Sequence, residues 1–220
     1  MKVNTYTNAC VNIEWYVIGE YDNNVFIISD TESVFAVDPS ADANALIRVL
    51  DGRKLDGIVL THRHSDHVDA AKKLRELTGA PTYAHPLDAS VIEGREPLPH
   101  LNGEFDPCPV DVLVNDGDIL NFGSMNWKVL HTPGHTEGHF CMLIDPKETD
   151  VPDGCPVLIG GDLVFCGSIG RTDFGGGDMS DMRSSLQRVS KLDKSTIILP
   201  GHGELTSVGL EENRVFAMYC

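Results

Sequence analysis

The sequence predicts an α/β protein in which two β-sheets pack together and helices cover their outer faces. Short segments rich in β-branched and aromatic residues recur along the chain and predict strands. In each half, segments with apolar residues at helical spacing follow the strands. The length of 220 residues suits one domain, or one domain with a small appendage, and 41% hydrophobic residues suffice for its core.

The first half of the chain is predicted to open with three strands and then to alternate between helices and strands. Ser40 or Asp42 stands where it can cap the first helix. Gly79 is expected to end the second helix, since glycine readily takes the left-handed conformation found at helix ends. A helix between two strands indicates a βαβ arrangement. The predicted strands are 11–19, 24–29, 33–38, 58–60 and 80–85, and the predicted helices are 43–50 and 68–79.

In the second half of the chain, predicted strands are again followed by a helix, after a long loop. Residues 93–109 contain four prolines and two glycines, which favour a loop that is long enough to be a lid or a pocket wall. A glycine-rich segment at 168–178 precedes the last predicted helix. The predicted strands are 110–114, 118–122, 125–132, 140–145, 155–162 and 195–200, and the predicted helix is 179–192.

The charge balance of the chain argues against a nucleic-acid partner. Acidic residues outnumber basic ones by 33 to 17, and the formal net charge is −16. Proteins that bind nucleic acid usually carry a basic face, and this chain has no run of lysine or arginine. We therefore expect no nucleic-acid partner, and the net charge disfavours a nuclease.

Composition also bears on where the protein works. The first 20 residues lack the apolar run of a signal peptide, and no segment approaches the length of a transmembrane helix. Six cysteines stand at irregular spacings without a C-x-x-C pair, and a chain of this length needs no disulfides. We expect a soluble, cytoplasmic protein with reduced thiols and no membrane partner, and the sequence leaves its oligomeric state open.

The cluster THRHSDHVDA at residues 61–70 directly follows a predicted strand. Three imidazoles placed this closely would repel one another if they were protonated, and they add little to a hydrophobic core. The H-x-H-x-D-H spacing therefore predicts a metal site. Taken alone, the PGH and GD sequences found elsewhere in the chain are typical of a turn and of a cap.

Further candidate ligands follow other predicted strands, and the loops at one edge of a sheet converge. Five imidazoles and two carboxylates exceed one tetrahedral site, but they fit two ions that share a carboxylate. Two such ions hold a hydroxide at neutral pH, because each lowers the pKa of bound water. We expect two divalent metal ions, zinc in the first place, with iron or manganese as alternatives. The candidate ligands are His62, His64, Asp66, His67, His135, Asp162 and His202.

Four motifs resemble those of the metallo-β-lactamase superfamily, in the same order and across nearly the whole chain. They are THRHSDH at 61–67, TPGHTEGH at 132–139, GGD at 160–162 and PGH at 200–202. The resemblance implies a four-layer αββα sandwich that residues 1–220 form as a single domain. It also implies two metal positions that share Asp162 as a bridging ligand. The first position is held by His62, His64 and His135, and the second by Asp66, His67 and His202.

The segment FCGSIGRTDFGGGD at 165–178 is similar to one in short, single-domain type II glyoxalases, which are hydroxyacylglutathione hydrolases, and residues 200–216 are similar as well. The resemblance implies hydrolysis of a small-molecule thioester such as S-lactoylglutathione, in which the bridging hydroxide attacks the acyl carbonyl. Asp66 is expected to orient this nucleophile besides binding metal, and is therefore the candidate catalytic residue. The C-terminal helical domain that binds glutathione in two-domain glyoxalases is expected to be absent, so loop 93–109 is a candidate for recognising the thiol.

Two other residues are candidates for supporting roles. His139 is expected to orient a metal ligand by hydrogen bonding. Arg171 either holds a substrate carboxylate or anchors its loop, and the structural role is preferred. Its candidate partners in that role are Asp66, Asp173 and Asp178. Asp69 departs from the small residue usual in the family, and it places a negative charge beside the site whose role the sequence leaves open.

The residues leave three alternative functions open. A persulfide dioxygenase binds a single iron, which the positions of His62, His135 and Asp162 would hold, and such proteins also resemble this chain in the GRTDF segment. A lactonase, lactamase or other ester hydrolase of the same fold would use the same metals. A metal-storing or scaffold protein is disfavoured, because all seven ligands are present.

Overall fold

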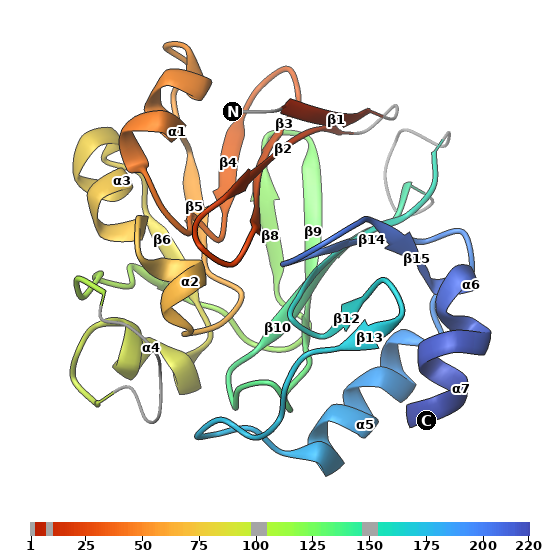
Figure 1. Cartoon of the computed structure of the whole chain (residues 1–220). Helices are drawn as coiled ribbons and strands as arrows, with labels where there is room; N and C mark the ends of the chain where they lie inside the picture. Colours follow the sequence, from red (N-terminus) through yellow and green to blue (C-terminus); the bar gives the residue numbers. More distant parts are fainter. Residues whose placement is uncertain (1–2, 8–10, 98–104, 147–153) are drawn as a thin grey trace.

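Two β-sheets pack face to face at the centre of the molecule, and helices cover the outer face of each sheet (Figure 1). This computed structural model describes residues 3–7, 11–97, 105–146 and 154–220. The layers follow one another as helices, sheet, sheet and helices, with a hydrophobic core between each pair of layers. The four-layer αββα sandwich expected from the sequence is therefore confirmed.

The first sheet comes from the N-terminal half of the chain. Among the described residues its strands are β1 Val3–Thr7, β2 Asn12–Ile18, β3 Asn23–Ser29, β4 Val34–Val37, β5 Gly57–Val59, β6 Thr82–Ala84 and β7 Val112–Leu113. They lie in chain order across the sheet, antiparallel from β1 to β4 and parallel from β4 to β7. Because parallel strands end at the same edge, the loops after β4 and β5 meet there.

The second sheet comes from the C-terminal half. Its described strands are β8 Ile119–Phe122, β9 Met125–His131, β10 Phe140–Ile144, β11 Val157–Gly161, β14 Ile197–Pro200 and β15 Thr206–Ser207. Across the sheet the order is β15-β14-β11-β10-β9-β8, and β11 and β14 are parallel neighbours. A small hairpin, β12 Val164–Phe165 and β13 Ser168–Ile169, follows β11. The parallel pair brings the loops after β11 and β14 to one edge.

Helices cover each sheet on the side away from its partner (Figure 1). The first sheet is covered by α1 Ala43–Leu50, α2 Ser65–Val68, α3 Ala71–Thr78 and α4 Pro86–Ile92. The second is covered by α5 Met179–Val189, α6 Val208–Glu211, a π-helical turn at Glu212–Phe216, and α7 Ala217–Tyr219. The C-terminal helical elements carry no strong sequence signal, because Gly209 and Asn213 have low helix propensity. In the part of the chain that the structure describes, no helix is both long and apolar enough to cross a membrane.

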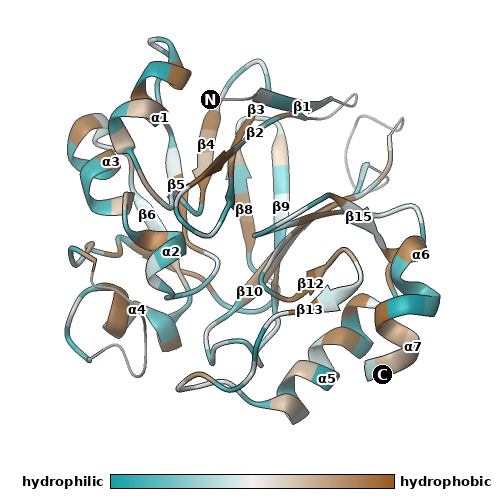
Figure 2. Cartoon of the chain, viewed as in Figure 1, coloured by the Kyte–Doolittle hydropathy of each residue, from teal (hydrophilic) through white to brown (hydrophobic). Residues whose placement is uncertain are grey.

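The central core lies between the two sheets and is rich in aromatic rings. Phe35 of the first sheet stacks on Phe122 of the second, with ring centroids 4.2 Å apart. Trp127 meets Phe35 edge-on at 5.8 Å and is fully buried. Figure 2 shows hydrophobic residues concentrated on the strands and mixed with polar residues on the covering helices. This pattern matches sheets that are buried on both faces and helices that are buried on one.

The helix predicted over 68–79 is found as α3, Ala71–Thr78, which begins three residues later than predicted, and a separate short helix precedes it. α2 already begins at Ser65, inside the histidine cluster, and ends at Val68. The backbone N–H of Ala70 then donates to the carbonyl of Pro39 instead of continuing the helix. Two predicted helix boundaries are confirmed. Asp42 caps the start of α1 by accepting a hydrogen bond from the N–H of Ala45, and Gly79 ends α3 with a φ of 72°.

Trp127→Ala is expected to lower the free energy of unfolding by about 3–5 kcal/mol, because it leaves a cavity in the aromatic contact between the two sheets. Urea unfolding followed by circular dichroism measures the loss. Val17→Ala is the control, because Val17 is 45% exposed and its truncation should cost less than about 1 kcal/mol. Equal losses in the two variants would contradict the importance of the contact between the sheets.

Candidate metal centre

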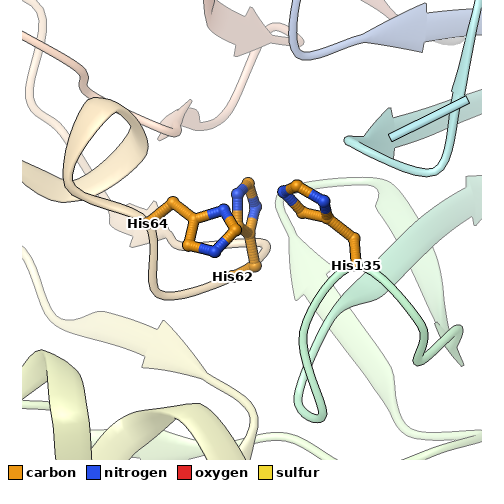
Figure 3. Close-up of side chains that lie close together, drawn as sticks. All are labelled: His62, His64 and His135. Atoms are coloured by element: carbon orange, nitrogen blue, oxygen red, sulfur yellow. The ribbon is translucent and has the colours of Figure 1, made fainter. Parts of the chain in front are cut away.

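Three imidazoles from two loops converge at the edge of the sandwich. His62 and His64 follow β5, and His135 lies in the loop between β9 and β10. Figure 3 shows the three rings directed toward one another. One ring nitrogen from each lies within 4.8 Å of the others, and all three residues are buried. This first group could hold a metal ion.

A second group lies beside the first. The Nε2 atoms of His67 and His202 are 3.2 Å apart, and Oδ2 of Asp66 lies 3.6 Å and 3.4 Å from them, respectively. His67 and Asp66 belong to α2, and His202 follows β14. The atoms of this group also meet within 4.8 Å, so it offers a second position for a metal ion.

Asp162 lies between the two groups and contacts both. Its Oδ2 is 3.4 Å from Nε2 of His135 in the first group, and its Oδ1 is 3.4 Å from Nε2 of His67 in the second. Asp162 directly follows β11. A Cβ at Gly201 would overlap its carboxylate, and a Cβ at Gly170 would overlap its carbonyl oxygen. The glycine of PGH thus makes room for the side chain of Asp162 and the glycine of GRTDF for its backbone, and all seven candidate ligands lie together.

The unsatisfied atoms of this centre fit a bound cation. Nε2 of His62, Nε2 of His135 and Oδ1 of Asp162 are buried and have no hydrogen-bond partner, which is rare for buried polar atoms. Burial, with the neighbouring imidazoles, lowers the pKa of His64 to about 2 and holds that of His62 well below its ordinary value. Neutral imidazoles and carboxylates are the forms that bind divalent metals, so the donor set fits.

The second group holds protons more tightly than the first. Burial lowers the pKa of His202, but hydrogen bonds to Asp162 and Asp66 outweigh it and raise the pKa to about 9. A metal ion that binds here must displace protons, so its affinity falls as the pH falls.

Two residues near the second group were missed by the sequence analysis. Asp38 accepts hydrogen bonds from Nδ1 of His67 at 3.0 Å and from Oγ1 of Thr61 at 2.6 Å. This fixes the tautomer of His67 with Nε2 toward the centre. Nδ2 of Asn23 lies 3.1 Å from Oδ2 of Asp66 and 3.4 Å from Nε2 of His202. Asp38 could have been identified from the sequence, because it directly follows a strand as Asp162 does. No sequence pattern singles out Asn23.

His139 and Arg171 both contact residues of the centre from outside it. Nε2 of His139 accepts a hydrogen bond from the backbone N–H of Asp162 at 3.0 Å. The Arg171 guanidinium pairs with Asp173 at 2.8 Å and lies 4.0 Å from the centroid of the Phe174 ring. Of its three candidate partners, Asp173 is therefore the one it meets. The carbonyl of Arg171 also accepts a hydrogen bond from Nδ1 of His135 at 2.7 Å.

A pocket of about 440 Å³ opens over the centre. Phe165, Ile169 and Phe174 give it an apolar wall, and Arg171 is the only arginine or lysine of its described lining. A smaller pocket of about 260 Å³ on the other side of Asp66 includes Asp69 in its lining. The described residues of loop 93–109 line neither pocket, which gives no support to their expected role in recognising the thiol, and residues 98–104 lie outside the described chain.

Comparison with known proteins assigns a family. Residues 18–202 match the family model of the metallo-beta-lactamase superfamily. An uncharacterized protein of Aquifex aeolicus (strain VF5) is 37% identical over 200 residues, which are 88% of this chain and 90% of that protein. The hydroxyacylglutathione hydrolase GloC of Haemophilus influenzae (strain ATCC 51907 / DSM 11121 / KW20 / Rd) is 32% identical over 213 residues, 92% of this chain and 95% of that protein.

Two solved structures share the fold. The crystal structure of TTHA1623 in a di-iron-bound form is 33% identical, with a TM-score of 0.76, and covers 91% of this chain and 97% of its own. The crystal structure of ETHE1 from Myxococcus xanthus is 25% identical, with a TM-score of 0.71, and covers 92% of this chain and 82% of its own. Both similarities extend over both halves of the sandwich.

Asp38→Asn is expected to weaken metal binding by roughly 10–100-fold, because the amide no longer fixes the tautomer and ring orientation of His67. Competition between the protein and a chromogenic chelator measures the affinity. Asp51→Asn is the control, since Asp51 is an exposed residue at the end of α1. Equal affinities for Asp38→Asn and the unmodified protein would show that Asp38 does not orient His67.

Proposed function

The chain belongs to the metallo-beta-lactamase superfamily, and from this premise we propose that it hydrolyses a small-molecule thioester such as S-lactoylglutathione. The observation that carries the proposal is the Asp162 carboxylate, which lies within 3.5 Å of ring nitrogens from both groups. A carboxylate so placed suits two metal ions, and the similarity to a hydroxyacylglutathione hydrolase supports the thioester.

The two groups of side chains would hold the two ions, with Asp162 shared between them. In this assignment the first ion is held by His62, His64 and His135, and the second by Asp66, His67 and His202. Divalent metals, when bound, lower the pKa of water and polarise a substrate carbonyl. Zinc suits imidazole and carboxylate donors, and iron or manganese suit them as well.

Asp66 is the proposed catalytic residue, because it belongs to the second group and also lines the larger pocket. Burial would raise its pKa, but the hydrogen bond from His202 and the charge of His67 outweigh burial and hold the pKa below its usual range. Asp66 therefore stays ionised and can accept a hydrogen bond from the attacking water, which orients it. A departing thiolate has a pKa of about 8.5 and needs little help from an acid.

The walls of the larger pocket would hold the substrate. Phe165, Ile169 and Phe174 exclude water from the reacting carbonyl, which strengthens electrostatic interactions there. The guanidinium of Arg171 is 61% exposed in its ion pair with Asp173, so it can also donate to a substrate carboxylate. Arg171 thus combines both roles considered for it, an anchor of its loop and a contact for an anionic group.

The alternative is a persulfide dioxygenase with a single iron, held by His62, His135 and Asp162. The structural similarity to ETHE1 favours it. The di-iron-bound form of TTHA1623 favours iron as the metal, but in a centre that holds two ions. A cytoplasmic location and the absence of nucleic-acid and membrane partners stay predictions from the sequence.

The protein loaded with zinc, iron or manganese is expected to contain about two metal ions per chain and to hydrolyse S-lactoylglutathione, because the centre offers two groups around one carboxylate. Elemental analysis measures the metal content, and the loss of thioester absorbance measures hydrolysis. Oxygen uptake with glutathione persulfide is measured in parallel. One iron per chain, with oxygen consumed and lactoylglutathione untouched, would replace the thioesterase proposal with the dioxygenase.

Asp162→Ala is expected to lose metal and to lower kcat/KM by about 10³-fold, since the metals supply several kcal/mol of transition-state stabilisation. Metal content and thioester hydrolysis are measured on the same sample. Asp51→Asn again serves as the control with both properties intact. Survival of metal binding and activity in Asp162→Ala would overturn the shared-ligand assignment.

A further inference from the structure

Arg63 stands between two candidate metal ligands, but its side chain turns away from them and is buried. Its guanidinium reaches three other segments of the chain. Nη1 lies 2.8 Å from Oδ1 of Asp88 on α4 and 3.0 Å from Oε2 of Glu137 in the loop before β10. Nη2 donates to the carbonyl of Gly175 at 3.0 Å. Arg63 therefore connects the histidine cluster to segments far away in the sequence.

Asp88 anchors this arginine in the interior. Its side chain is 1% exposed and accepts hydrogen bonds from the backbone N–H of Arg63, Oγ1 of Thr136 and the backbone N–H of Gly138, besides the guanidinium. A buried carboxylate with this many donors holds its partner in one position. Glu137, by contrast, is 60% exposed, so its contact with Arg63 adds little.

The glycine-rich loop, residues 170–178 between β13 and α5, is packed directly on the Arg63 guanidinium. Gly176 has a φ of 87°, and a Cβ at this position would overlap Nη2 of Arg63. The loop also carries the carbonyl of Arg171, which orients His135, and the side chains of Arg171 and Phe174, which line the larger pocket. The position of the pocket wall thus depends on where the guanidinium lies.

We propose that Arg63 is a positioning residue that fixes the glycine-rich loop against the metal centre and thereby shapes the substrate pocket. The proposal rests on the proposed function in so far as this pocket binds the substrate. Arg63 itself lines neither pocket around the centre, so it acts through the loop. The role needs arginine, because a planar fork can meet Asp88 and the carbonyl of Gly175 together, whereas the single ammonium of a lysine cannot.

The test compares two variants in the same background. Arg63→Met alone would leave the charge of Asp88 buried without a partner and would endanger folding. Asp88→Asn is therefore the reference, because the asparagine oxygen can still accept from Arg63 and Glu137 remains 3.0 Å from the guanidinium as its counter-charge. Arg63→Met with Asp88→Asn is the test variant. Metal content, KM and kcat for S-lactoylglutathione, and hydrogen exchange of the peptide over residues 168–178 are measured for both.

Relative to Asp88→Asn, the double variant is expected to raise KM and the exchange rate of the loop amides roughly two- to tenfold, the effect of one lost hydrogen bond, with metal content unchanged. Arg63→Lys is expected to raise the hydrogen-exchange rate of the loop amides as the double variant does. Equal loop exchange and equal KM in both proteins would overturn the proposal, as would a loss of metal with the loop unaffected. If the unmodified protein hydrolyses no thioester, the proposed function fails, and loop exchange still decides the role of Arg63.

Discussion

The carboxylate of Asp162 is buried between the two groups of candidate ligands. It is stabilised there because the segments after β5, β9, β11 and β14 come together around it. Burying a carboxylate is costly unless charges or donors surround it. His67 of α2 approaches it, as do His135 and His202 from two loops, and Nε2 of His139 accepts a hydrogen bond from the backbone N–H of Asp162. The sandwich supplies these loops because β5, β11 and β14 all end at the edge where the two sheets meet.

The surroundings of the ligands fix which nitrogen each histidine presents. Four of the five candidate imidazole ligands have Nδ1 within hydrogen-bond reach of a group outside the centre. The partners are Oγ1 of Thr61 for His62, Asp38 for His67, the carbonyl of Arg171 for His135 and the carbonyl of Tyr21 for His202. Nε2 is thereby left for the centre, and in His67, His135 and His202 it lies within 3.5 Å of the Asp162 carboxylate. A site held this way before metal arrives loses little entropy when it binds.

The sequence predicted the seven candidate ligands because each stands in a short motif after a strand, and this signal is local. Asn23 and Arg63 escaped prediction because their roles depend on contacts with distant residues, whereas Asp38 stands directly after a strand, as Asp162 does, and could have been predicted. The guanidinium of Arg63 donates to the carbonyl of Gly175, 112 positions away, and no local sequence pattern predicts that contact. The same reason explains why the helix predicted from residue 68 begins only at Ala71, since its start depends on a hydrogen bond from Ala70 to Pro39. Local patterns thus predicted the layers and the candidate ligands, but not the contacts that orient these side chains.

The charges around the two pockets bear on how a thioester would lie in the proposed reaction. A net charge of −16 gives no long-range attraction for an anionic substrate, so local contacts must position it. Arg171 borders the larger pocket, whereas Glu20 and Asp69 border the smaller one. A substrate carboxylate is stabilised beside the guanidinium and repelled from the acidic side. In the proposed reaction, the carboxylate-bearing end of the thioester would therefore point toward Arg171 with its acyl carbonyl near Asp162, and the smaller pocket would suit an uncharged or cationic group.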